Sequence, residues 1–391
     1  MSEERYQYFK NLLEQEKCFK MICGAGNEDK EHVKRLSFVY TLAGASVLDI
    51  SANPEVVTSA KEGINMAFER AHEFGVSLTD EPFIMVSVGM PGDHHVRKSY
   101  IDPLKCIKCN LCAPVCPTDA IPYDFTEKLD VFKDLGGSFE KENQEKEIVI
   151  KDLCIGCGKC SNICPKDDII SYRHNARELE ILLPECVKAG AECFELHAAV
   201  GDDDVTLEEW KILQKINPNN FNSICLDRLH LGNFNLQNRI EKIKEISGQK
   251  FIVQADGYPM SGGENDFNTT IQAVACADVI NKRFNMIVNK KKDNHDSDVK
   301  SKISSKRKYR RQGHRMGVYI VLSGGTNSLT RKLADMSSVR INGVAVGTYA
   351  RDVVEKYVQK HDFYDNTDAI KMAYKRARSL VLSNIKGDND G

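Results

Sequence analysis

Residues 106–117 read CIKCNLCAPVCP, and residues 154–165 read CIGCGKCSNICP. Both stretches place cysteines in the pattern C-x2-C-x2-C-x3-C, and a proline follows the last cysteine. A [4Fe–4S] cubane needs four thiolate ligands, and cysteines at positions i, i+3 and i+6 wrap a tight loop around three of its corners. The two runs therefore predict two [4Fe–4S] clusters.

The fourth cysteine of each run is expected to ligate the other cluster, as it does in two-cluster ferredoxins of the bacterial type. The predicted ligand sets are Cys106, Cys109, Cys112 and Cys164 for one cluster, and Cys154, Cys157, Cys160 and Cys116 for the other. Apolar side chains at matching places in the runs are expected to shield the clusters from water; these are Ile107, Ile155, Ile121 and Ile169. Zinc is disfavoured, because zinc knuckles use two cysteines each and have a longer loop between pairs.

The rest of the chain alternates short apolar segments with helix-length amphipathic stretches, a pattern typical of a parallel sheet covered by helices. The expected strands are Phe19–Cys23, Ser46–Ile50, Phe83–Val88, Cys193–His197, Ser223–Leu226, Phe251–Gln254, Tyr319–Leu322 and Gly343–Val346. The expected helices include Glu31–Leu42, Pro54–Phe74 capped by Asn53, Asn175–Lys188, Thr206–Gln214 with a Thr206/Glu209 capping box, and Leu236–Ile246. These units predict an α/β fold with a TIM-like (β/α) barrel, and an open doubly wound α/β sheet is the alternative.

The cysteine runs interrupt this alternation directly after the third expected strand. The predicted domains are the first part of the barrel at residues 1–90, a 2[4Fe–4S] ferredoxin-like insert at 91–172, and the remainder of the barrel at 173–391. In a barrel the βα loops form the active face, so we expect both clusters over the mouth. A Lys/Arg-rich segment at 282–315 has little apolar periodicity and is expected to be a disordered insertion.

Two glycine-bearing loops follow the last two strands and are candidates for a phosphate or flavin-phosphate site, because barrels bind phosphate there. Their residues are Ser323, Gly324, Gly325 and Thr326 in one loop, and Gly347, Thr348 and Arg351 in the other, with the Arg351 guanidinium as counter-charge. The alternative is two tight turns that need glycine for backbone reasons. His197 and the run Asp202 to Asp204 are a further candidate, for a cation or for acid–base chemistry, against solvated charge before a helix.

Composition and charge limit the partners. The net charge of −2 gives no general preference for nucleic acid or membranes, and no stretch approaches the roughly 18 apolar residues of a membrane span. The basic segment has no aromatic platform beside it, which disfavours nucleic acid as a partner. Of the 14 cysteines, eight lie in the two runs, and no secretory signal is recognised, so metal ligation in a reducing compartment is expected. Among the remaining cysteines, Cys23 at a strand end is the candidate reactive thiol.

Several segments occur in the same order as in one known family. They are CFKMICGAGNED at 18–29, YTLAGASVLDISANPEVVTSAKEGI at 40–64, the two cysteine runs, QADGYPMSGG at 254–263 and VLSGGTN at 321–327. Together they resemble the light-dependent period protein A (LdpA) family of cyanobacteria and plastids. The resemblance implies an iron–sulfur protein that reports redox state, and hence light, to circadian clock components, in a cyanobacterium-like cytoplasm or the plastid stroma.

Two functions therefore follow as expectations. In the first, the clusters sense a redox pool, exchange electrons with a donor or acceptor, and alter the affinity of a protein partner. In the second, the barrel is an oxidoreductase that receives electrons from the insert at a bound flavin or substrate. A plain electron carrier with the barrel as scaffold ranks below both.

Overall fold

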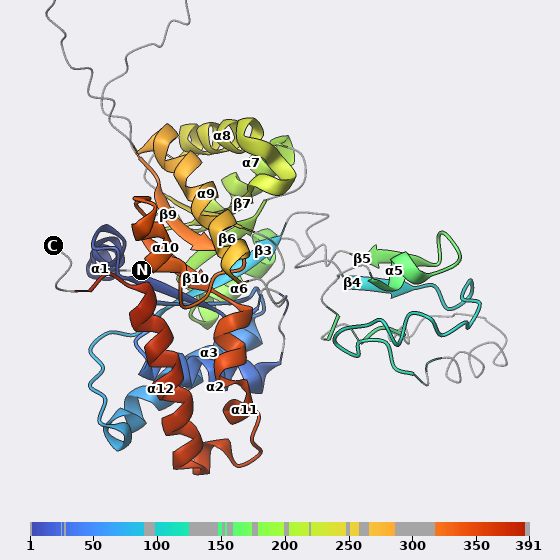
Figure 1. Cartoon of the computed structure of the whole chain (residues 1–391), viewed down its shortest axis with the longest axis horizontal. Helices are drawn as coiled ribbons and strands as arrows, with labels where there is room; N and C mark the ends of the chain where they lie inside the picture. The colour runs from blue at the N-terminus through green and yellow to red at the C-terminus, as the bar shows by residue number, and fades with distance from the viewer. Residues whose placement is uncertain are drawn as a thin grey trace, which may run out of the picture.

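Eight parallel strands close into a barrel in this computed structural model (Figure 1). The strands are β1 (Cys18–Ile22), β2 (Val47–Ser51), β3 (Phe83–Gly89), β6 (Cys193–His197), β7 (Ser223–Asp227), β8 (Ile252–Asp256), β9 (Tyr319–Ser323) and β10 (Gly343–Val346). Their order around the barrel is β1-β10-β9-β8-β7-β6-β3-β2, and the pairing of β1 with β10 completes the ring. The predicted barrel is confirmed, and the open sheet is wrong.

The structure describes most of the barrel and part of the insert. The described residues are 2–24, 26, 29–89, 98–123, 125, 148–150, 153–154, 159–173, 179–198, 203–218, 220–247, 251–257, 266–285 and 317–387. Among them, no helix has the length and apolar character needed to cross a membrane.

Helices follow the strands and cover the outside of the barrel. They are α2 (Lys30–Leu42), α3 (Pro54–Arg70), α6 (Leu179–Ala189), α7 (Asp203–Ile216), α8 (Arg228–Ser247), α9 (Asp266–Phe284), α10 (Thr330–Met336), α11 (Thr348–Val358) and α12 (Thr367–Asn384), with short 3-10 turns η1 (Ala71–Phe74) and η2 (Phe363–Asp365). The Asn53 side chain accepts from the backbone N–H of Glu55 and Pro54 opens α3, as the sequence predicts.

Two local predictions are wrong. Helix α7 begins at Asp203, so Thr206 lies buried inside the helix and forms no capping box with Glu209. The earlier start is stabilised by the Asp203 carboxylate, which accepts from Arg239 Nε at 2.8 Å and from Lys242 Nζ at 2.8 Å on α8. The second wrong prediction is the start of the disordered insertion expected at 282–315, because residues 282–284 belong to α9, which continues to Phe284. Residues 286–315 lie outside the described part of the chain.

The inward-facing side chains are layered along the barrel axis. Near the amino ends of the strands they are apolar, and they pack with Phe9 and Leu13 of the N-terminal helix α1 (Glu3–Glu14) in a cluster that includes Val47, Phe83 and Phe221. Further along the strands they become polar and charged. Helix α1 thus closes one end of the barrel, and the polar layers lie toward the other.

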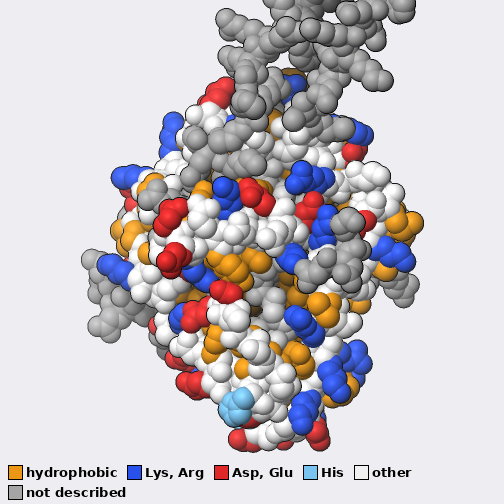
Figure 2. Space-filling view, turned by 90° about the vertical axis from the view of Figure 1, so that its left-hand side faces the viewer, with side chains coloured by type: hydrophobic (Ala, Val, Ile, Leu, Met, Phe, Trp, Pro, Cys, Tyr) orange, Lys and Arg blue, Asp and Glu red, His pale blue; other side chains and the backbone are white. Residues whose placement is uncertain are grey.

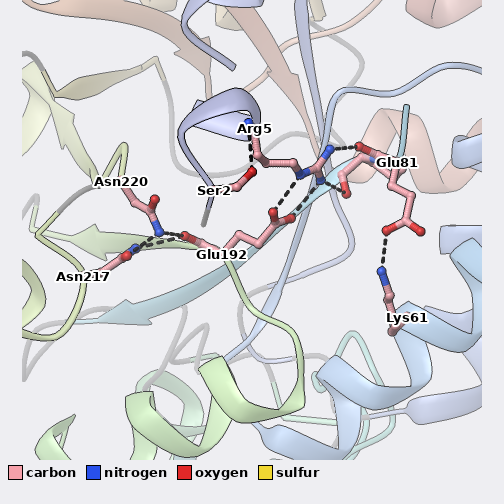
Figure 3. Close-up of polar contacts among 8 residues, drawn as sticks. Ser2, Arg5, Lys61, Glu81, Glu192, Asn217 and Asn220 are labelled. Atoms are coloured by element: carbon pink, nitrogen blue, oxygen red, sulfur yellow. Dashed lines mark hydrogen bonds and ion pairs between the residues drawn. The ribbon is translucent and has the colours of Figure 1, made fainter. Parts of the chain in front are cut away.

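Arg5 fastens α1 to that closed end (Figure 3). Its guanidinium donates to both carboxylate oxygens of Glu192, at 2.7 and 2.9 Å, and to the carbonyl oxygen of Glu81 at 2.7 Å. It also lies 3.8 Å from the centre of the Phe83 ring. The carbonyl oxygen of Glu192 in turn accepts from the side-chain amides of Asn217 and Asn220, which links α1 to the loops before β6 and β7.

The face of the molecule that carries α1 has a mixed character. Figure 2 shows Lys and Arg side chains interspersed with Asp and Glu and with apolar side chains on this face. This arrangement agrees with the net charge of −2. Long-range electrostatic attraction of a polyanion to this face is therefore not expected.

We expect Arg5→Ala to lower the free energy of unfolding by about 2 to 3 kcal/mol, because it removes charge-assisted hydrogen bonds and leaves Glu192 partly buried without its partner. Anaerobic urea unfolding followed by far-UV circular dichroism measures this. The control is Arg376→Ala, whose exposed guanidinium contacts Tyr357, and which should change stability by less than about 0.5 kcal/mol. Equal midpoints for the two variants would contradict the role given to Arg5.

Candidate iron–sulfur site and polar barrel mouth

The insert enters and leaves through an antiparallel strand pair. Strand β4 (Lys98–Ile101) pairs with β5 (Ile170–Arg173), so both ends of the insert lie together after β3. A separate small apolar core, which includes Ile101, Ala120, Val149 and Ile169 beside several cysteines, supports the two runs. Strand β3 ends at Gly89 and α6 begins at Leu179, and the exact domain boundaries between these positions and the strand pair stay predictions.

The two halves of the insert are joined by equivalent hydrogen bonds. Before the first run, the backbone N–H of Asp102 donates to the carbonyl oxygen of Ile169, which follows the second run, at 2.9 Å. Before the second run, the N–H of Ile150 donates to the carbonyl oxygen of Ala120, which follows the first run, at 2.8 Å. Each bond ties the end of one run to the start of the other. The fourth cysteine of each run is thereby brought to the opposite run.

This crossing produces two cavities, each lined by cysteines from both runs. One cavity, of about 310 Å³ including its solvent-open part, is lined by Cys106, Cys109, Cys112 and Cys164 with Ile101, Phe125 and Ile169. The other, of about 300 Å³, is lined by Cys116, Cys154 and Cys160 with Ser99, Ile121 and Val149. These groups match the two predicted ligand sets, except that Cys157 lies outside the described residues. Ligation by these cysteines stays a prediction.

The backbone of the first run supports a tight loop around a cluster. Lys108 and Asn110, between the first three cysteines, have left-handed φ values of 59° and 55°. Glycine accepts such values without strain, and the second run has Gly156 and Gly158 at the equivalent positions. The same loop conformation is therefore compatible with both sequences.

Backbone donors point at several of the thiols. The N–H of Ala120 lies 3.2 Å from Cys116 Sγ, the N–H of Ser99 lies 3.4 Å from Cys154 Sγ, and the N–H of Lys108 lies 3.5 Å from Cys106 Sγ. Hydrogen bonds to thiolate sulfur stabilise negative charge and are one of the means by which proteins set cluster potentials. The described cavities therefore fit [4Fe–4S] groups in ligand type and in hydrogen bonding.

Shielding of the two cavities is uneven. Ile121 and Ile169 are buried, as expected, but Ile107 is 49% exposed and Cys109 is also exposed. Ile107 nevertheless lines the first cavity, so it covers that cavity while part of its side chain faces solvent. Ile155 lies outside the described residues. The cavity of the first run is therefore accessible to a redox partner from the Cys109 side.

The glycine-bearing loop after β9 is explained by its packing. Gly324 and Gly325 have φ values of 69° and 70°, and a Cβ on Gly324 would lie 1.7 Å from Asp256 Oδ1. The carbonyl oxygen of Gly325 accepts from Thr270 Oγ1 at 2.8 Å, and Thr326 Oγ1 donates to the carbonyl oxygen of Ala345. These contacts agree with the tight-turn alternative.

The second predicted loop is also occupied by contacts within the chain. Gly347 precedes α11, and the Arg351 guanidinium donates to Thr348 Oγ1 at 3.2 Å and to the carbonyl oxygen of Cys23 at 3.3 Å. A phosphate or flavin site at Ser323 to Thr326 and Gly347 to Arg351 stays a prediction.

The expected reactivity of the Cys23 thiol has no support in the structure. Burial raises the pKa of Cys23 to about 12, and Asp49 adds to the shift, so this thiol is protonated at neutral pH.

The centre of the barrel holds a buried ionic group that sequence reasoning missed. Lys20 Nζ on β1 lies 2.8 Å from Asp49 Oδ2 on β2 and pairs with Glu195 Oε2 on β6. Glu195 also accepts from Ser223 Oγ at 2.9 Å and from Gln254 Nε2 at 2.8 Å. All five side chains belong to residues less than 5% exposed. The available signal was a charged residue at the centre of an apolar strand, in CFKMI for Lys20 and CFELH for Glu195.

Ionisation in this group is governed by burial and by the ion pairs. Burial opposes charge on Lys20, but Asp49 and Glu195 outweigh it and raise the pKa of Lys20. Burial opposes charge on Glu195 too, but Lys20 and His197 lower its pKa to about 2. Burial, with the charge of Glu195, raises the pKa of Asp49 despite Lys20. The Lys20–Glu195 ion pair is therefore the charged centre of the barrel.

One layer closer to the mouth, His197 Nε2 lies 3.2 Å from Glu195 Oε1, and Cys225 Sγ donates to Asp256 Oδ2 at 3.3 Å. Burial raises the pKa of Asp256 to about 7. Of the predicted combination of His197 with Asp202 to Asp204, Asp203 pairs instead with α8, and Asp202 lies outside the described residues. His197 is brought together with Glu195 and Cys225.

The insert lies on the side of the barrel opposite α1, beyond the carboxyl ends of the strands (Figure 1). It stands off from the barrel in that view. The polar mouth and the insert are thus on the same side of the molecule. The expected position of the clusters directly over the mouth stays a prediction.

Comparison with known proteins agrees with the cysteine geometry. Residues 105–169 match a family model described as a 4Fe-4S dicluster domain, and residues 146–196 match a second model of that description. The chain is 39% identical to Light dependent period A of Synechococcus elongatus over 105 residues. The matched region is 26% of this chain and 28% of that protein. The chain is an iron–sulfur protein that is similar over this part to Light dependent period A. Its cofactors are two [4Fe–4S] clusters.

The match to this LdpA relative spans less than a third of either protein. Among solved structures, the YdjI aldolase of Escherichia coli K12 aligns over 98% of this chain and 96% of that chain, with 8% identity and a TM-score of 0.44. A putative fructose-1,6-biphosphate aldolase of Coccidioides immitis aligns over 98% of each chain, with 9% identity and a TM-score of 0.43. At these values neither aldolase carries an argument about the activity of this chain.

We expect Lys20→Met to lower the free energy of unfolding at pH 7 by about 3 to 5 kcal/mol, because it leaves two buried carboxyl groups without their cation. In the parent, the lowered pKa of Glu195 contributes stability that is fully present above its ordinary value of 4.5 and is lost as pH falls toward 2. The variant lacks this contribution, so the difference in free energy of unfolding between parent and variant should narrow as the pH is lowered from 4.5 toward 2.

Chemical unfolding of both proteins across that pH range measures the difference. Lys34→Met is the control, because Lys34 pairs with Glu62 at the surface, where an ion pair contributes at most about 1 kcal/mol. A gap between the parent and Lys20→Met that stays constant with pH would show that Glu195 is not the group affected.

Proposed function

We propose that this protein is a redox sensor: its two clusters exchange electrons with a cellular pool, and their charge alters the affinity of the insert for a protein partner. The observation that carries the proposal is the pair of cavities in which cysteines from the two runs cross. Cys106, Cys109, Cys112 and Cys164 would hold one cluster, and Cys116, Cys154, Cys157 and Cys160 the other. The clusters supply one-electron chemistry when bound.

The surface of the insert supports a binding role for it. Leu104 and Tyr123 are 67% and 62% exposed, and Ile107, Leu111 and Leu153 are also exposed. Exposed apolar side chains close to a cluster suit a contact whose strength responds to the cluster. One added electron about 10 Å from a partner's charge changes their interaction by about 1.7 kcal/mol at an effective dielectric constant of about 20. That corresponds to a change of about 15-fold in affinity.

The partner that we propose is a component of the circadian clock. The support is the similarity to a protein named Light dependent period A. Light changes the redox state of photosynthetic cells, so a cluster protein in the cytoplasm or plastid stroma would convert light into a change of protein affinity. The two cavities provide the redox part of this proposal, and the named relative provides the timing part.

A second candidate is an oxidoreductase that uses the barrel mouth. It is favoured by the buried ionisable groups around Glu195 and Asp256, which lie on the same side of the barrel as the insert. A flavin or phosphate held by the loops at Ser323 to Thr326 and Gly347 to Arg351 would then take electrons from the clusters. The two candidates differ in whether a second redox group is bound.

The first experiment is a chemical analysis of the anaerobically purified protein. We expect about eight irons and eight sulfides for each chain, a broad absorption band of iron–sulfur type, and no flavin after acid extraction. Flavin in a ratio of about one for each chain would overturn the sensor proposal in favour of the oxidoreductase. Iron near zero in protein purified without oxygen would contradict both.

The second experiment tests coupling between cluster and partner. Binding to clock proteins of the same organism is measured by anaerobic biolayer interferometry with oxidised and with reduced protein, and we expect the affinities to differ about tenfold or more. Cys109→Ser should lose this difference and about half of the iron while the thermal transition of the barrel is retained. Cys276→Ser, which changes a buried cysteine of α9, is the control and should keep both. Equal affinities of the oxidised and the reduced protein for the clock proteins would contradict the proposal.

A further inference from the structure

Three side chains of different chemistry converge inside the barrel mouth. Glu195 and His197 belong to β6 and Cys225 to β7, and one carboxylate oxygen, one imidazole nitrogen and the thiol sulfur all lie within 4.8 Å of one another. The register pairs His197 with Cys225 across the two strands, and Glu195 faces inward two residues before His197. The backbone of two neighbouring strands therefore sets their spacing. All three residues are at most 9% exposed.

We propose that Glu195, His197 and Cys225 bind a zinc ion. A carboxylate oxygen, an imidazole nitrogen and a thiolate sulfur are the three ligand types that proteins use for zinc. Hard cations such as magnesium and calcium prefer oxygen ligands alone, so the sulfur and nitrogen disfavour them. The site is separate from the cysteine runs, and the proposal holds whichever function the clusters serve.

The charges around the three side chains favour a cation. The carboxylates of Asp49, Glu195 and Asp256 are buried in the mouth, and the described residues bring one ammonium group, that of Lys20, into contact with the first two. A divalent cation beside Glu195 would lie among acidic side chains, whose oxygens attract positive charge. When the metal binds, the Cys225 thiol loses its proton to solvent and the sulfur coordinates as thiolate.

The surroundings also hold the proposed ligands in position. Gln254 Nε2 donates to Glu195 Oε1 at 2.8 Å, and Lys20 and Ser223 bind the other oxygen, so the carboxylate is fixed and offers Oε1 to the metal. Outer contacts of this kind orient ligands in zinc sites. Beside Cys225, Asp256 Oδ2 lies 3.3 Å from the sulfur, while its buried Oδ1 has no hydrogen-bond partner among the described residues. That oxygen packs against Gly324 in the loop after β9 and is not one of the proposed ligands.

Three protein ligands leave one tetrahedral position for water or a substrate. Sites that only stabilise a fold are usually closed by four protein ligands, whereas sites with three are typical of zinc that acts on a bound molecule. The site extends from the middle of β6 and β7 to His197 at the carboxyl end of β6, the side on which barrels bind their substrates. The proposed zinc would therefore serve a small-molecule site in the mouth that is distinct from the two glycine-bearing loops after β9 and β10.

The test uses the anaerobic protein with both clusters loaded. It is incubated with zinc sulfate, excess metal is removed on a chelating resin, and zinc and iron are measured together by mass spectrometry. We expect one zinc for each chain in addition to about eight irons. His197→Gln and Cys225→Ser should each weaken zinc binding at least tenfold and keep the iron. His32→Gln and Cys276→Ser, which change a histidine paired with Glu355 and a cysteine in α9, are the matched controls and should keep the zinc.

Zinc-edge X-ray absorption of the same protein identifies the ligands and does not depend on whether a variant folds. We expect one sulfur at about 2.3 Å, with nitrogen and oxygen at about 2.0 to 2.2 Å. A shell of three or four sulfurs would place the zinc in the cysteine runs and overturn the proposal. Failure of the parent to retain zinc, or retention of equal zinc by His197→Gln, would overturn it as well.

Discussion

Closure of the barrel through β1 and β10 is the constraint on which the rest of the structure depends. Backbone pairing of residues 18–21 with residues 343–346 joins segments from the two ends of the chain and leaves the main sheet without an edge. A closed parallel sheet must fill its interior with side chains. It also directs all eight carboxyl ends to one side. The polar mouth lies at that side, and the insert, which follows β3 in the chain, is attached there too.

The interior of this barrel is divided by chemistry. Around Phe83 and Phe221, with Phe9 of α1, it is an apolar core that excludes water. Around Lys20 and Glu195 it is an ionic group with hydrogen bonds from Ser223 and Gln254. Burying such a group contributes less to stability than apolar packing of the same volume. The presence of this ionic group in the centre of the barrel is therefore better explained by a functional role at the mouth than by stability.

The insert reaches its geometry by a different route. It has little apolar core of its own, and the described hydrogen bonds between its halves are few, so metal ligation supplies much of its stabilisation. The bonds from Asp102 to Ile169 and from Ile150 to Ala120 bring each fourth cysteine to the opposite run. Small metal-binding domains generally derive folding free energy from their metal. Loss of a cluster would then loosen the surface that carries Leu104 and Tyr123, and a sensor can use such a change.

The sequence by itself determined the two clusters, the eight strands and the position of the insert. Each of these depends on local spacing: cysteines three apart for the cubane, apolar segments for the strands, and a break after Phe83–Val88 for the insert. Local pattern also misled, at the Thr206/Glu209 capping box, because the ion pair of Asp203 with Arg239 starts α7 earlier. That contact joins residues 36 positions apart, and periodicity carries no information on it.

Only the tertiary structure decided which polar residues meet. Lys20 and Glu195 are 175 positions apart in the chain, and Cys225 gives no sign in the sequence that it faces His197. Barrel closure and strand register bring them together, and both are properties of the whole sheet. Conversely, Gly324 and Gly325 had suggested a phosphate loop, whereas contacts with Asp256 and Thr269 account for them. The reason is the same in each case: these neighbours come from distant strands, which sequence spacing does not relate.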